Sequence, residues 1–172
     1  LANRLIVMSQ QMKTVLGRKS AEIIPYGIDL DRFRPLARDE SRQRLSLTED
    51  APILLFPYDP SRKIKRYSLA TAAVEILKLE FPNIQLIAIH DRPYEHIPLY
   101  MNACDVLLMT SKSEGAPVAV REAMACNLPI VSVDVGDVTS VIGTTDSCAI
   151  VDADPEAMAT SIAEILRTGK RS

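Results

Sequence analysis

The chain has 172 residues, of which 47% are hydrophobic and 24% charged, and its 20 Lys and Arg against 22 Asp and Glu give a formal net charge of −2. This composition is typical of a globular domain and excludes a disordered or fibrous chain. The charge balance gives no support to nucleic-acid binding, and no apolar run approaches the roughly 18 residues of a membrane span.

Short apolar runs alternate with helical stretches along the whole chain. We predict strands at 4–9, 21–25, 52–57, 84–90, 104–110, 128–133 and 148–152, and helices at about 9–19, 38–46, 66–80, 95–104, 117–127, 137–142 and 155–168. The strands are continuous apolar runs, which indicates burial on both faces and hence a parallel sheet covered by helices. The prediction is one doubly wound, Rossmann-like α/β domain over residues 1–172.

In such a sheet a ligand binds beyond the carboxyl ends of the strands. Three loops there are candidates: 58–66, 91–95 and 111–117. The last contains Gly115, which lets the backbone approach a ligand, and Pro117, which we expect at the first position of the next helix. The alternative is an ordinary turn in which Ser113 or Glu114 caps that helix.

Glu122 lies inside that predicted helix. Its neighbours three and four residues away are uncharged, so no ion pair within the helix explains it. A buried carboxylate is costly unless it accepts hydrogen bonds. A sugar diol would supply two donors, and a side chain from another element would serve equally well.

Four cations, Arg62, Lys63, Lys65 and Arg66, crowd the loop after the strand 52–57. A cation run is most simply a solvated surface, but here it lies where a diphosphate would bind. The loop "HDRPYEH", residues 90–96, offers His90, Arg92 and Tyr94 as weaker candidates for contacting a base, with a turn that ends the strand as the alternative.

The cysteines and histidines are few and scattered. Three Cys without a CxxC pattern and two His predict no metal site, and the Cys are expected to be small buried hydrophobes in a reducing compartment. We therefore expect a cytoplasmic protein. Because the chain starts at Leu1 and enters a strand at once, we also expect it to be part of a longer protein.

Four segments resemble one enzyme family. "SEGAPVAVREAMACNLPIVSVDVGD" is similar to the "EGxxxxxxEAMAxxxPVV" signature of retaining GT-B glycosyltransferases in the glycogen-synthase-like group, also called glycosyltransferases group 1. "IIPYGIDLDRFRP", "ILLFPYDPSRKIKRYSLATAAVEIL" and "LYMNACDVLLMTS" match further segments of that group in the same order. The resemblance implies one half of a GT-B fold, the carboxyl-terminal domain that binds a nucleotide-diphosphate sugar.

The resemblance also assigns roles to residues. It implies that Glu114 lies by the hydroxyls of the donor sugar and that Glu122 accepts from the ribose. Lys65, with Arg62 as companion, would hold the diphosphate and stabilise its charge as it leaves. The remaining donor-binding candidates are Lys63, Ser113, Gly115, Ala116 and Pro117, and His90 and Arg92 are weak candidates for the base.

The chain departs from the family pattern in three places. Tyr58 and Asp59 replace the glycine and arginine that usually end the strand, so the cationic role would move to Arg62 or Lys63. Tyr26 stands where asparagine is usual, and a strand-helix unit is missing between 91 and 95, which shortens the wall near the base.

The leading hypothesis is the donor domain of a metal-independent transferase that moves a hexose to an acceptor hydroxyl in polysaccharide or glycoconjugate synthesis. Its missing partner would be an amino-terminal acceptor-binding domain, without which the chain binds but does not catalyse. The parent could lie at the inner face of the membrane. The alternatives are a stand-alone nucleotide- or sugar-phosphate-binding module, and a GT-B enzyme of other chemistry such as an epimerase or phosphorylase.

Overall fold

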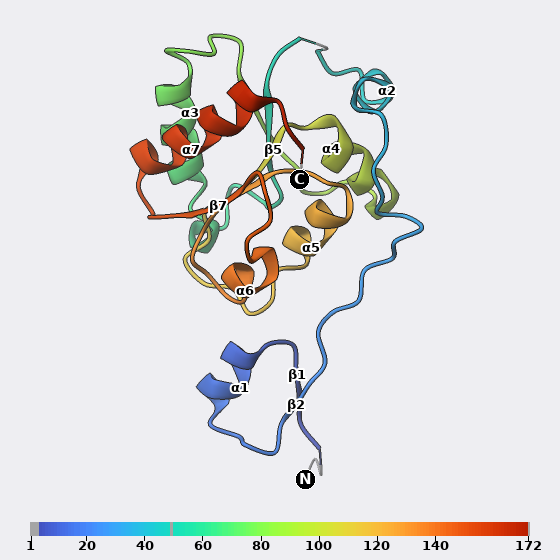
Figure 1. Cartoon of the computed structure of the whole chain (residues 1–172), viewed down its shortest axis with the longest axis vertical. Coiled ribbons are helices and arrows are strands. Elements are labelled where there is room, and N and C mark those ends of the chain that lie inside the picture. Colours follow the sequence, from blue (N-terminus) through green and yellow to red (C-terminus); the bar gives the residue numbers. More distant parts are fainter. Residues whose placement is uncertain (1–3, 49, 172) are drawn as a thin grey trace.

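The computed structural model describes residues 4–48 and 50–171 (Figure 1). The elements are β1 (Ile6–Val7), α1 (Gln10–Leu16), β2 (Glu22–Ile23), α2 (Arg38–Arg44), β3 (Ile53–Phe56), η1 (Lys63–Lys65), α3 (Tyr67–Leu77), β4 (Gln85–Ala88), η2 (Tyr94–His96), α4 (Ile97–Ala103), β5 (Val106–Met109), α5 (Val118–Ala125), β6 (Ile130–Val133), α6 (Val138–Ile142), β7 (Cys148–Val151) and α7 (Pro155–Thr168). Every predicted strand and helix is present: α7 has the predicted bounds, the predicted helix 95–104 is divided into η2 and α4, and the other elements are shorter at one or both ends.

The main sheet has five parallel strands in the order β4-β3-β5-β6-β7. On β3, Leu54 pairs with Leu86 of β4 on one side and with Val106 of β5 on the other. The three inner strands are buried at every position, whereas the edge strands β4 and β7 are half-buried. The prediction of a doubly wound parallel sheet is therefore confirmed, and burial on both faces explains the continuous apolar runs.

Helices cover both faces of this sheet. α3 packs against α7, and α4 lies between α2 and α5 on the other side (Figure 1). α7 has clear sequence signals at both ends: the Asp154 side chain accepts a hydrogen bond from the Ala157 amide at 2.9 Å, and Gly169 ends the helix with φ +60°. No helix in the described part of the chain is long and apolar enough to cross a bilayer.

The first two strands do not join the main sheet. β1 and β2 pair in parallel with each other only, apart from the main sheet (Figure 1). Residues 22–40 are exposed except Ile28 and Phe33. The expectation of a single sheet is therefore wrong for residues 4–24. The reason is that these short strands have one or no buried residue each, so they carry no apolar face that the main sheet could cover.

Candidate functional site

The connections of β3 and β5 diverge at the centre of the sheet. The chain leaves β3 toward the edge strand β4, and it leaves β5 toward β6 on the opposite side. Such a switch point opens a crevice beyond the carboxyl ends of the two strands, where open α/β sheets bind ligands. The loops 57–66 and 110–117 follow these two strands, so the position between them is where the crevice is expected.

A lysine and a glutamate meet across these two loops. Lys65 of η1 is 5% exposed, and its Nζ lies 2.5 Å from Oε1 of Glu114. The side chain of Glu114 is also largely buried. The two residues that the sequence placed at the diphosphate and at the donor sugar are therefore direct neighbours. Their charges are little screened, because water has poor access to either group.

Tyr58 supports the same lysine from another side. Its ring centroid lies 3.6 Å from Nζ of Lys65, and its ring packs edge-on against Phe56. Burial and the nearby Glu114 carboxylate raise the pKa of the Tyr58 phenol well above its ordinary value, so the phenol stays protonated. The residue that departs from the family pattern at the end of β3 thus provides an aromatic face for the lysine.

The two loops are tied together by Arg66. Its Nε donates to the Thr110 carbonyl oxygen at 2.6 Å and its Nη2 to the Ser111 carbonyl oxygen at 3.1 Å. The Thr110 hydroxyl donates in return to the Lys65 carbonyl oxygen at 2.6 Å. Of the four loop cations, Arg66 is thus engaged in holding the loops. Arg62 and Lys63 remain exposed beside the crevice.

The turn before α5 rests on a glycine that the sequence reading missed. Gly136 has φ +60°, and a Cβ there would lie 3.0 Å from the Gly115 carbonyl oxygen and 3.1 Å from Cβ of Glu114. Pro117 lies at the N-cap of α5 rather than at its first helical position, and no side chain caps this helix. The alternative in which Ser113 or Glu114 caps it is therefore wrong. Ser113 is exposed, and Ala116 is half-buried.

Glu122 is 6% exposed on the covered face of α5. Its Oε1 accepts a hydrogen bond at 3.0 Å from the hydroxyl of Tyr94, at the start of η2. Burial raises the pKa of Glu122 above its ordinary value, and the Tyr94 hydrogen bond opposes that rise. A partner from another element was one of the two explanations left open by the sequence, and the structure provides it. The two other candidates in this loop, His90 and Arg92, are exposed.

A cleft of about 590 Å³ lies next to the Glu114 turn. Met8–Gln11, Ile23 and Pro25 line it on the amino-terminal side, and Arg121, Asp134, Gly136, Asp137 and Thr139–Val141 line it on the side of α6. Arg121 does not point toward Glu122 but pairs with Asp137. Met12 of α1 also approaches Gly115, with its Sδ 3.3 Å from the position a Cβ would take. The amino-terminal unit, which comprises β1, α1 and β2, thus borders the candidate site.

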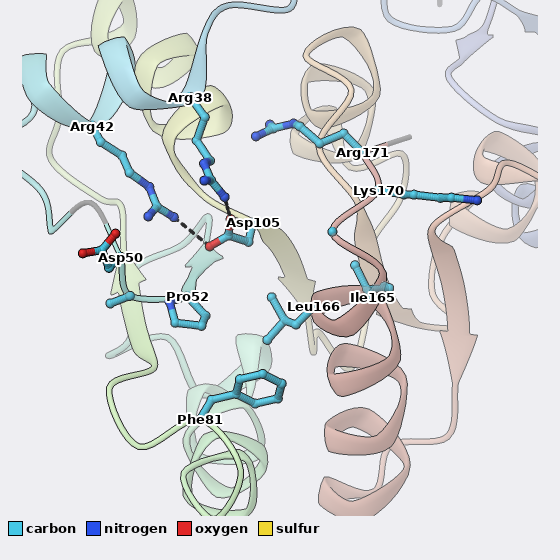
Figure 2. Close-up of a pocket in the computed structure, with 12 residues that line it drawn as sticks. Arg38, Arg42, Asp50, Pro52, Phe81, Asp105, Ile165, Leu166, Lys170 and Arg171 are labelled. Atoms are coloured by element: carbon cyan, nitrogen blue, oxygen red, sulfur yellow. Dashed lines mark hydrogen bonds and ion pairs between the residues drawn. The ribbon is translucent and has the colours of Figure 1, made fainter.

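A second cavity, of about 450 Å³, lies at the opposite ends of the strands (Figure 2). There Asp105, just before β5, receives Nη2 of Arg42 at 2.8 Å and Nη1 of Arg38 at 3.0 Å. The Ile53 amide also donates to Asp105 at 2.7 Å. Figure 2 shows Lys170 pointing away from this carboxylate, whereas the Arg171 side chain extends toward the side of Arg38 and donates to the carbonyl oxygens of Met101 and Asn102, each at 3.0 Å. The charges here hold the start of β3 and β5 together and lie far from the crevice.

No cluster of His, Cys, Asp or Glu suited to a metal ion occurs among residues 4–48 and 50–171. Cys104 and Cys126 are buried thiols, and Cys148 is half-buried.

Comparison with known families decides the assignment. Residues 62–168, more than half of the chain, match the family model described as glycosyl transferases group 1. The chain belongs to this family. The matched range contains Lys65, Glu114 and Glu122 and begins after the amino-terminal unit.

The chain is also similar to named family members. It is 26% identical over 170 residues to a protein named teichuronic acid biosynthesis glycosyltransferase TuaC from Bacillus subtilis, a match that covers 90% of this chain and 43% of TuaC. It is 28% identical to the D-inositol 3-phosphate glycosyltransferase of Geodermatophilus obscurus, over 84% of this chain and 40% of that protein. The chain spans less than half the length of these relatives.

Solved structures share the fold. Sucrose-phosphate synthase from Thermosynechococcus elongatus superposes with a TM-score of 0.75 at 24% identity, over 98% of this chain and 50% of that one. HepE of Anabaena, solved in complex with UDP, superposes with a TM-score of 0.78 at 16% identity, over 99% of this chain and 56% of that one. The chain therefore belongs to the glycosyl transferases group 1 family and has the fold of one half of a GT-B protein.

Proposed function

We propose that this chain binds a nucleotide-diphosphate sugar for a retaining transferase, which moves a hexose to an acceptor hydroxyl in polysaccharide or glycoconjugate synthesis. The observation that carries the proposal is the buried Lys65–Glu114 pair at the switch point of the sheet. A cation and a carboxylate joined in this crevice match a ligand with a diphosphate at one end and hydroxyls at the other.

Lys65 is the group for the diphosphate. Its side chain is 7% exposed, so little water would surround a phosphate oxygen that contacts it. The attraction between the ammonium and the phosphate is stronger there than in bulk water. The ammonium has three donors, so it can keep contact with Glu114 while it donates to phosphate. Arg62 and Lys63, exposed beside the crevice, would add charge at its mouth and steer the anion inward.

Glu114 is the group for the sugar. Its carboxylate can accept from sugar hydroxyls with the oxygen that Lys65 does not engage, which would place the anomeric carbon close to the cation. The backbone of Gly115, Ala116 and Pro117 follows at once, without a side chain at 115 to keep a ligand away. As the bond to the diphosphate breaks, Lys65 would stabilise the negative charge that develops on the leaving group.

The acceptor side is expected on another domain of the parent protein, because a match to only 40–43% of TuaC and its relative leaves room for one. Transfer requires both substrates to be held in register, so we expect this chain alone to bind donor without turning it over. HepE has been solved with UDP and with UDP-glucose. These ligands are therefore the first to test.

The test is isothermal titration of the chain with UDP, GDP, ADP and their glucose conjugates, with and without EDTA. We expect one nucleotide to bind in both conditions, and Lys65→Met to weaken it. Lys78→Met is the matched control, because Lys78 is an exposed lysine at the C-cap of α3 that pairs with Glu75. A folded chain that binds none of these nucleotides would contradict the proposal.

A further inference from the structure

The carboxylate of Glu122 has one oxygen engaged and one open. Oε1 accepts from the Tyr94 hydroxyl at 3.0 Å, and within the described chain the structure records no second hydrogen bond to this side chain. Without the tyrosine hydroxyl, the Glu122 carboxylate, which is only 6% exposed, would have no protein hydrogen bond to offset the cost of its lost hydration. The tyrosine therefore decides which oxygen is left for a ligand and in which direction it points.

Tyr94 is itself held in place, although its side chain is half exposed. The guanidinium of Arg32 lies 5.1 Å from the centroid of its ring, and Phe33, which is fully buried, packs against the ring at a centroid distance of 5.6 Å. The backbone around Arg32 is fixed in turn, because Oδ1 of Asp29 accepts from the Arg32 amide at 3.1 Å. The segment 29–33, which is far from Tyr94 in sequence, thus helps to hold the Tyr94 hydroxyl on Glu122.

We propose that Tyr94 is a positioning residue for nucleotide recognition: its hydroxyl fixes one oxygen of Glu122 so that the other accepts a hydrogen bond from a ribose hydroxyl. The inference rests on the proposed donor-binding function. It assigns to Tyr94 a role in telling ribonucleotides from deoxyribonucleotides. A deoxyribose bound in the same place would leave the second Glu122 oxygen buried and without a donor. A site built to bind a hydroxyl binds an analogue without that hydroxyl much more weakly for this reason.

The alternative is that Tyr94 only braces the loop before α4. The two roles differ in what the isosteric Tyr94→Phe change does. A positioning role predicts a loss confined to ligands that carry the ribose hydroxyl, whereas a bracing role predicts an equal loss for ribose and deoxyribose ligands. The ring contacts with Arg32 and Phe33 remain in the variant, so the hydroxyl alone is tested.

The experiment measures Kd for UDP, GDP and ADP and for their 2′-deoxy and 3′-deoxy counterparts. We expect the wild-type chain to prefer the ribose form of its nucleotide by about tenfold or more at one hydroxyl, as for a hydrogen bond to a charged group. Tyr94→Phe should reduce that preference to about threefold or less while leaving the deoxy Kd unchanged. Tyr26→Phe, which removes a hydroxyl from another exposed tyrosine, should change neither Kd.

An unchanged preference in Tyr94→Phe, or no preference in the wild-type chain, overturns the role of Tyr94 and leaves the donor-binding function standing. An equal loss for both sugar forms also overturns it and makes Tyr94 a bracing residue. If the wild-type chain melts cooperatively, and is therefore folded, but binds no nucleotide, the result contradicts the proposed donor-binding function itself.

Discussion

Lys65 and Glu114 are 49 positions apart in sequence, yet their side chains form an ion pair. The sequence could nominate each of them, because each stands in a loop that follows an apolar strand. It could not predict their contact, which depends on the register of β3 against β5. Nor could it predict the Tyr58 ring beside the lysine, since an aromatic residue at a strand end most often signals packing alone.

The Lys65 role is tested by comparing a nucleoside diphosphate with its monophosphate. Lys65→Met should weaken the binding of UDP by about 10- to 100-fold, the range for a hydrogen bond to a charged group, and should weaken UMP much less. Titration calorimetry gives both values. Lys63→Met changes an exposed cation two residues away on the same turn and should have a small effect that disappears at high salt. Equal losses for UDP and UMP would contradict a contact with the second phosphate.

The raised pKa of Glu122 predicts opposite effects of one substitution on stability and on binding. The folded state holds the Glu122 proton more tightly than the unfolded state, so the contribution of Glu122 to stability is highest at low pH and declines as pH rises from the ordinary pKa of 4.5 to the raised one. Glu122→Gln removes this cost while keeping an oxygen for Tyr94. The variant should therefore be more stable than wild type at about pH 7 and equal to it at about pH 4.

Urea denaturation at the two pH values measures that difference, and nucleotide titration of the same samples measures the loss of binding. A Glu122→Gln chain less stable than wild type at neutral pH would mean that the ionised carboxylate is stabilised by more than Tyr94. In the wild-type chain, nucleotide affinity should also fall as pH drops through the raised pKa, because only the ionised form has both oxygens free of a proton, one to accept from Tyr94 and the other to accept from the ligand.

At the scale of elements, the sequence predicted strands and helices well because their signals are local. The run 155–168 has Asp before Pro at its start and Gly after its end, and α7 occupies that range. Pairing was less predictable. A two-residue strand such as β2, with no buried position, shows where the chain is extended but not which neighbour it joins.

The turn that carries Glu114 was predicted, but its support was not. Gly136 stands between a strand and a short helix, and only its φ of +60° and the closeness of Gly115 show why glycine is needed there. A signal existed in "DVGDV", where glycine interrupts an apolar run just before a helix.

Gly136→Ala and Gly169→Ala form a matched pair. Both glycines have φ +60°, so each substitution should cost about 1–2 kcal/mol of unfolding free energy for the left-handed backbone. At Gly169 a Cβ meets nothing within 4 Å, whereas at Gly136 it would press on the Glu114 turn. Gly136→Ala should therefore cost a further ~1–3 kcal/mol and weaken nucleotide-sugar binding. Equal stability losses and unchanged binding in both variants would show that the turn does not depend on Gly136.

At the scale of the whole molecule, the two ends of the sheet have different tasks. The carboxyl ends of the strands carry the exposed cations and the Lys65–Glu114 pair. The amino ends carry the Asp105 network, whose donors already have protein partners: Arg42 also donates to the Ala103 carbonyl oxygen at 2.9 Å. This separation follows from the parallel sheet, which brings all loops of one kind to one edge.

Arg42 and Arg38 share Asp105 but differ in burial, and this difference allows the last prediction. The Arg42 side chain is 1% exposed and that of Arg38 is 47% exposed. Arg42→Met leaves the Asp105 carboxylate without its buried cation and should lower the free energy of unfolding by about 3–5 kcal/mol. Arg38→Met removes an exposed pair and should cost about 1 kcal/mol or less.

Urea denaturation measures both losses, and UDP titration below the unfolding transition provides the functional comparison. Because the network lies at the far ends of the strands, neither variant should change the ratio of UDP to UMP affinity while the chain is folded. Similar stability losses in the two variants would mean that Asp105 is held by its hydrogen bond from the Ile53 amide rather than by Arg42. A changed UDP to UMP ratio would mean that the two ends of the sheet are coupled through β3 and β5, the strands that connect this network to the Lys65–Glu114 pair.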